Sequence, residues 1–173
     1  LYALEYRGTP VRTPYTVEGS ASMTLPSNLL LIGTMNTADR SIALIDYALR
    51  RRFTFIDLQP DREVVRTAGW RGERDRDGAL ALFDQVQTLF AGENAPLAVG
   101  HSYFLPSGTS SNEEASLRTM ARRFAYEVVP LLTEYAAEGL IDSEALGGLL
   151  AAVGVGSDAS QTEVEVQVLQ WLS

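Results

Sequence analysis

A polar segment at residues 36–40 combines residue types that are suited to phosphate chemistry. Asn36, Asp39 and Arg40 follow directly on a mostly apolar run at residues 29–34. In open α/β sheets, ligands bind beyond the carboxyl ends of the strands. An asparagine there can orient a water molecule against a phosphate, and an arginine can bind phosphate oxygens in a bidentate manner. The alternative is a plain turn with a surface pair between Asp39 and Arg40, and the spacing alone leaves both interpretations open.

Three consecutive arginines, Arg50, Arg51 and Arg52, form a second candidate site. Capping the last turn of a helix explains one or two of them, because each such arginine contributes about 0.3–1 kcal/mol. An arginine that completes a phosphoryl-transfer site changes the rate by about 10³–10⁵, which corresponds to about 4–7 kcal/mol. A helix over residues 41–51 would separate Asn36 from Arg51 by about 15 Å. If both residues are catalytic, Arg51 must therefore serve a neighbouring subunit, and a ring of subunits follows.

His101 is the only histidine in the chain. A lone histidine among apolar and aromatic neighbours is more often a hydrogen-bonded structural residue than a base or ligand. Since no second histidine and no carboxylate cluster accompanies it, a metal-centred hydrolase is not expected. We interpret the mixed charges of residues 71–77 as a solvated loop, and Glu113 and Glu114 as acids that complement the dipole at the start of a helix.

The composition excludes several classes of enzyme. The chain of 173 residues has no cysteine, and all 14 of its basic residues are arginines. Disulfides, thiolate metal sites, Schiff-base chemistry and a lysine-containing phosphate-binding loop are therefore absent from this sequence. Residues 1–80 hold 11 arginines against 10 acids, whereas residues 81–173 hold 3 against 12. This acidic second part argues against nonspecific nucleic-acid binding. With no leader and no long apolar stretch, a cytoplasmic protein without a membrane span is expected.

The pattern of apolar residues predicts an α/β piece followed by a mainly helical piece, with the boundary near Pro60. In the first piece, a strand at 29–34, a helix at 42–51 and a strand at 53–58 would form a βαβ unit of a parallel sheet. The end of a helix at 1–6 and a small hairpin or ordered loop at 9–28 precede it. The later elements expected are helices at 62–70, 77–90, from 111 or 112 to 137, and 143–153, a turn or short strand at 95–105, and a half-buried strand at 162–169.

Several motifs resemble one family. Residues 35–41, Met-Asn-Thr-Ala-Asp-Arg-Ser, resemble the M-N-x-x-D-R-[S/T] signature of the GTPase motor subunit of McrBC modification-dependent restriction endonucleases, an AAA+ ring protein. Residues 46–53 resemble the arginine-finger helix end of that family, and residues 100–104 and 129–135 are similar to parts of its helical lid. The resemblance implies that residues 1–60 belong to an AAA+ α/β core and residues 61–153 to the lid, followed by a tail at 154–173.

The resemblance also implies roles for the site residues. Asn36 would be sensor 1, Asp39 and Arg40 would organise the subunit interface, and either Arg51 or Arg52 would be the trans-acting finger. The nucleotide would be GTP or ATP, with Mg²⁺. The partners would be copies of the subunit in a ring, a hexamer in full-length members of the family, an McrC-type nuclease subunit, and DNA bound through other domains or the assembled complex.

His101 is a weak candidate for a residue near the nucleotide. The phosphate-binding loop and the acidic Mg²⁺ strand of the family are expected upstream of Leu1, so this chain alone is expected to be inactive. Two alternatives stay open: a noncatalytic AAA+-like subunit-interaction module, and a small arginine-based nucleic-acid-binding domain. The acidic balance of residues 81–173 counts against the second.

Overall fold

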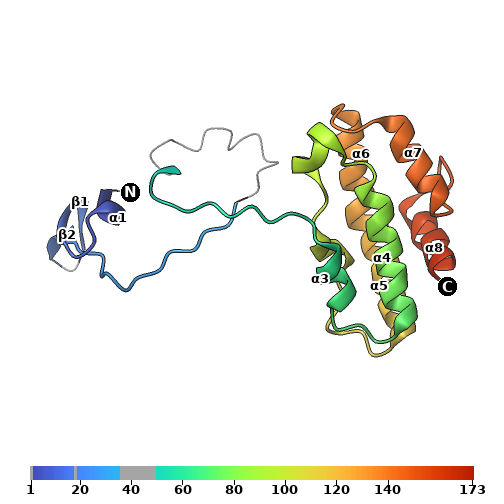
Figure 1. Cartoon of the computed structure of the whole chain (residues 1–173), viewed down its shortest axis with the longest axis horizontal. Helices are drawn as coiled ribbons and strands as arrows, with labels where there is room; N and C mark the ends of the chain where they lie inside the picture. Colours follow the sequence, from blue (N-terminus) through green and yellow to red (C-terminus); the bar gives the residue numbers. More distant parts are fainter. Residues whose placement is uncertain (1, 18, 36–49) are drawn as a thin grey trace. The chain divides into compact units, whose positions relative to one another are not determined.

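In the computed structural model, which describes residues 2–17, 19–35 and 50–173, the chain divides into two units, Leu1–Leu58 and Gln59–Ser173 (Figure 1). The first unit contains the short helix α1 (Tyr2–Glu5) and an antiparallel pair of strands, β1 (Val11–Val17) and β2 (Ser20–Met23). Val11 pairs with Met23 and Val17 with Ser20, and the register is irregular between them. Gly19 has φ of 80° in the tight connection, a conformation that glycine adopts without strain. The predicted hairpin is thus confirmed.

The parallel sheet expected from residues 29–34 and 53–58 is not confirmed. Residues 30–35 and 54–60 belong to no helix or strand. Their apolar side chains are open to solvent, with Leu30 83%, Ile32 93% and Leu58 84% exposed. A buried strand needs neighbouring strands along its edges, and among the described residues the only strands that pair are β1 and β2. The polar segment 36–41 and the predicted helix, up to residue 49, lie outside the described residues.

The second unit is helical, as the sequence predicts. Figure 1 shows α4 and α5 lying alongside each other, and α3 packs against α4 while α8 packs against α5. Its elements are α3 (Arg62–Thr67), α4 (Glu73–Gln87), η2 (Gly92–Leu97), η3 (His101–Phe104), α5 (Glu113–Arg123), η4 (Phe124–Val128), α6 (Val129–Ala137), α7 (Ser143–Ala152) and α8 (Gln161–Leu172). The core between them includes Leu82, Phe104, Leu117, Phe124 and Leu132, each at most 2% exposed.

The long helix predicted from Asn112 to residue 137 is confirmed, with one irregularity. The Asn112 side chain caps α5 by accepting a hydrogen bond from the Ala115 N–H at 2.8 Å. The helix continues through the π-helical turn η4 into α6. Pro130 has no N–H with which to bond the carbonyl one turn earlier, and the wider turn, in which Val129 N–H bonds to Phe124 O, lies directly before it.

The predicted strand at 162–169 is wrong, because these residues belong to helix α8. The alternation of Val164, Val166 and Val168 suits a strand. However, the residues that are buried are Val164, Val168 and Leu172, which are spaced four apart as on one helical face, while Val166 is 51% exposed. Ser160 begins the helix through a capping box with Glu163. The helix packs this face against α5 and η4.

The remaining differences are small. Residues 95–105 form 3₁₀ turns and no strand, and α7 takes Asp142, not Ser143, as its cap. No helix in the described part of the chain is both long and apolar enough to cross a membrane.

Candidate functional site

The three consecutive arginines differ sharply in their surroundings. Arg50 lies over the Phe55 ring, with its Cζ atom 5.6 Å from the ring centroid, which is a cation–π distance. Arg52 forms an ion pair with Glu5 of α1 at 3.0 Å, and its side chain is only 16% exposed. Arg51 is exposed, and it forms no ion pair with any of the residues that the structure describes. Arg51 is therefore the arginine that is available to a ligand or another chain.

The segment around α1 contacts both Arg52 and the start of the apolar run at 29–34. Glu5 holds Arg52, while the Arg7 guanidinium donates a hydrogen bond to the carbonyl of Leu29, where the apolar run toward Asn36 begins. Gly8 N–H bonds to Leu25 O at 2.7 Å. Asn36, Asp39 and Arg40 lie outside the described residues, so their roles stay predictions.

His101 is held in a hydrogen bond within the helical unit. Its Nδ1 accepts the backbone N–H of Asp61 at 3.2 Å, so the neutral ring carries its proton on Nε2. Arg123 fixes the same turn by donating to the carbonyls of Tyr103 at 3.2 Å and Leu105 at 2.8 Å. This geometry is what a structural histidine requires, and a nucleotide contact through Nε2 stays a prediction.

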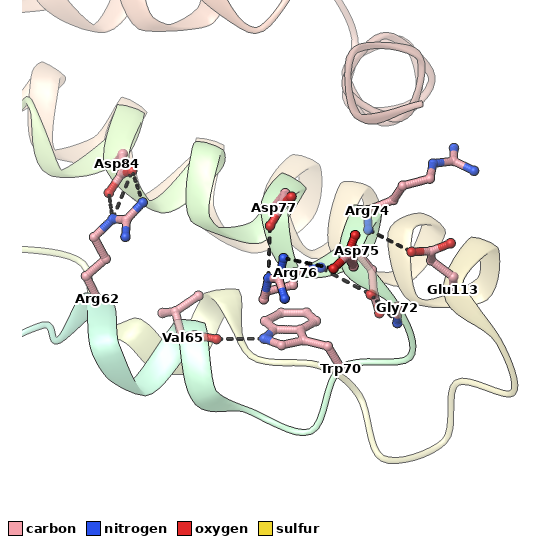
Figure 2. A network of polar contacts seen from close by, with 11 residues as sticks. Arg62, Val65, Trp70, Gly72, Arg74, Asp75, Arg76, Asp77, Asp84 and Glu113 are labelled. Atoms are coloured by element: carbon pink, nitrogen blue, oxygen red, sulfur yellow. Dashed lines mark hydrogen bonds and ion pairs between the residues drawn. The ribbon is translucent and has the colours of Figure 1, made fainter.

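The interpretation of residues 71–77 as a solvated loop is wrong, because Asp75 lies in the first turn of α4 with no exposed surface. Its carboxylate accepts backbone N–H groups at the start of the helix (Figure 2), from Gly72 at 2.9 Å, Arg71 at 3.1 Å and Arg76 at 3.1 Å. An acid three residues after the N-cap is the sequence signal of such a cap, and it was present here. Asp75 therefore starts α4 four residues earlier than the apolar pattern indicates.

A second carboxylate closes the same helix end from α5. Glu113 accepts the Arg74 N–H at 2.7 Å (Figure 2). The side chain passes so close to Gly72 that a Cβ atom there would lie 2.2 Å from its Oε1. Glu113 thus complements the N-terminus of α4, in addition to standing in the first turn of its own helix.

Two further polar contacts of Figure 2 join α3 to its surroundings. Arg62 makes a bidentate pair with Asp84, with Nε to Oδ1 at 2.8 Å and Nη2 to Oδ2 at 2.9 Å. This hydrogen bond, together with the charge of Asp84, raises the pKa of the Arg62 guanidinium. Trp70 Nε1–H donates to Val65 O at 2.7 Å. These contacts link α3 to α4 and to the segment that follows α3. Among the described residues, no group of three or more histidines and acids is placed to hold a metal.

Comparison with known proteins gives one informative match. The chain is similar to the McrB subunit of the Type IV methyl-directed restriction enzyme EcoKMcrB of Escherichia coli strain K12, at 32% identity over 123 residues. The match covers 64% of this chain and 26% of the relative, so the chain spans about a quarter of the length of the relative. No family model matches the chain, and no solved structure matches it significantly.

Proposed function

We propose that this chain, which is related by partial homology to an McrB-type restriction subunit, is part of a nucleotide-hydrolysing motor of a modification-dependent restriction system. The motor would use GTP or ATP, and would act on DNA together with a separate McrC-type nuclease subunit. The signature at residues 35–41 and the arginines that follow it support this assignment. In the assembled protein, copies of the subunit would form a ring.

The observation that carries the proposal is the difference between the surroundings of Arg51 and those of Arg52. Arg52 is mostly buried and bound to Glu5, so its role would be to fix the turn. Arg51 is exposed and has no ion pair among the described residues, so it is the arginine that fits the phosphates of a neighbouring subunit's nucleotide. An exposed guanidinium suits phosphate oxygens, with which it can form two parallel hydrogen bonds.

Asn36 would polarise the attacking water, and Asp39 with Arg40 would organise the subunit interface. Bound Mg²⁺ would supply charge neutralisation at the phosphates, and since the described residues contain no cluster of metal ligands, other parts of the protein would hold it. His101 would lie near the nucleotide with its Nε2–H available. Because the sequence has no lysine, the lysine of a phosphate-binding loop would also come from outside this chain, and this chain alone would not hydrolyse nucleotide.

A complementation experiment with the longer protein that contains this chain tests the proposal. GTP and ATP turnover is measured for Asn36→Ala, Arg51→Ala and Arg52→Ala, with and without the nuclease partner. We expect Arg51→Ala to lower turnover by about 10³-fold or more, and Arg52→Ala to act more weakly. Because Asn36 and Arg51 would act on the same nucleotide from different subunits, mixing the two inactive variants should restore part of the activity.

The outcomes separate the possible functions. Turnover that is unchanged by Arg51→Ala, or a mixture as inactive as its components, would refute a trans-acting Arg51. A ring that assembles but shows no turnover with either nucleotide would identify a noncatalytic interaction module instead. Arg50→Ala is the matched control, since Arg50 is engaged with Phe55 and should affect turnover little.

A further inference from the structure

A groove on the helical unit lies between α6 and the start of α8. It is shallow and open, has a volume of about 520 Å³, and is lined by Val129, Pro130, Thr133, Glu134, Ala137, Ala159 and Gln161. Small and apolar side chains form most of this lining, and Glu134 is its only charged residue. The volume falls within the range of sites that accept a ligand or an anchoring side chain.

The walls of the groove are firmly built. Val129 and Ala159 pack against the hydrophobic core, and Leu132, on the other side of α6, is fully buried. The hydroxyl groups of Tyr126 and Thr162 lie 3.3 Å apart and join η4 to α8. The Gly156 N–H donates a hydrogen bond to the Gln167 side chain at 3.2 Å, and this bond anchors the loop before α8. The groove is thus a fixed feature of the packed unit.

The segment that forms the groove, residues 124–173, carries charge of a single sign. Residues 124–173 contain no arginine, lysine or histidine, and they contain the acids Glu127, Glu134, Glu138, Asp142, Glu144, Asp158, Glu163 and Glu165. Among the described residues, none of these carboxylates has an ion pair. Glu138 and Asp158 directly adjoin groove residues in the sequence, and both are exposed. This segment therefore carries negative charge that its own residues do not balance.

We propose that this groove, bordered by unpaired carboxylates, is a docking site for a cationic amphipathic segment of a partner protein. An apolar side chain of the segment would enter between α6 and α8, and its lysines or arginines would face Glu134, Glu138 and Asp158. Opposite charges of this kind steer association and select the partner. The same charges repel the phosphate backbone of DNA. This docking site does not depend on the proposed nucleotide chemistry.

The test uses the 173-residue chain and a fluorescein-labelled synthetic peptide, read by fluorescence anisotropy without nucleotide. The peptide has about 16 residues, enough for a helix to form on a surface, with leucines on one face and lysines on the other. Two further peptides carry glutamates in place of the lysines, or serines in place of the leucines. We expect only the peptide with both lysines and leucines to bind, and to bind more weakly as salt rises from about 50 mM to about 300 mM.

Matched variants locate the binding site. Glu134→Arg reverses a charge inside the groove, and Glu144→Arg reverses an exposed charge on α7, outside it. We expect the first to weaken binding by about tenfold and the second by about twofold at most, since the segment contacts only the first charge. Ala137→Trp and, independently, Thr133→Trp fill the groove without changing its charge and should each weaken binding by about tenfold. Far-UV circular dichroism verifies that each variant is folded.

Three results would overturn the proposal. Equal effects of Glu134→Arg and Glu144→Arg on peptide binding would show that the peptide is held only by general charge attraction. Unchanged binding in both tryptophan variants would show that the peptide does not bind in the groove. Binding of labelled duplex DNA to the chain, lost in Ala137→Trp and Thr133→Trp, would assign the groove to nucleic acid.

Discussion

Asp75 provides the sharpest test of how the helical unit is stabilised. The side chain has no exposed surface, and its two oxygens accept the backbone N–H groups of Gly72 at 2.9 Å and Arg71 at 3.1 Å. Asp75→Ala would leave both donors at the start of α4 without a protein acceptor. A hydrogen bond to a charged group contributes about 1.5–3 kcal/mol, and loss of a cap costs about 0.5–2 kcal/mol. Both figures count part of the same hydrogen bonding, so they do not add in full. We therefore expect Asp75→Ala to lower the free energy of unfolding by about 2–4 kcal/mol.

Urea denaturation followed by far-UV circular dichroism measures this loss. Domains of this size have a total stability of about 5–15 kcal/mol, so the midpoint should shift visibly. Asp75→Asn keeps the shape, but its Nδ2 would face a backbone donor, and we expect it to lose about 1–2 kcal/mol. Asp77→Ala is the matched control, because Asp77 is an exposed partner of Arg76 on the same helix and should cost at most about 0.5 kcal/mol. A loss below about 0.5 kcal/mol for Asp75→Ala would refute the account of Asp75 as the cap of α4.

Two other predictions follow from the capping contacts. Gly72→Ala would displace the Glu113 carboxylate, which would lie 2.2 Å from the new Cβ, and would break its bond to Arg74. We expect the free energy of unfolding to fall by about 1–2 kcal/mol, and Glu113→Ala should lower it by a similar amount. The double variant should lose less than the sum of the two. Strictly additive losses in urea denaturation would disprove the shared contact. Hydrogen bonds from Ser160 lower the pKa of Glu163 below its ordinary value of 4.5. The ionised carboxylate therefore stabilises α8 above that value and loses this effect as the pH falls through the lowered pKa. Thermal unfolding should show Ser160→Ala less stable than the unaltered chain near neutral pH, with the difference shrinking toward about pH 3; a difference that is constant with pH would contradict this.

The start of α5 was predictable because its cap depends only on nearby residues. Asn112 accepts an N–H three residues later, and such a bond depends on residue type and local backbone alone. Asp75 offered the same kind of signal, three residues after Gly72. Its complete burial depends on tertiary packing, and the mixed charges of residues 71–77 indicated a solvated segment instead. For α8 the valine spacing suited both a strand and a helix. Packing against α5 decided between them.

The strands expected at 29–34 and 53–58 show the opposite limit. The apolar composition of these runs predicts that they are buried, whereas in the structure most of their side chains are exposed. A strand is completed by partners that can be distant in sequence, so no local pattern states whether those partners are available.

For the candidate site, the sequence by itself determined the residue types, the order of the motifs and the resemblance to McrB-type motors. It also determined the acidic character of residues 124–173, because charge is a property of composition. Only the tertiary structure distinguished Arg51 from Arg52, since the partner of Arg52 is Glu5, far earlier in the chain. Only the tertiary structure placed α6 beside the start of α8 and formed the groove between them. Both depend on contacts between distant residues, and the spacing of residues along a chain does not specify such contacts.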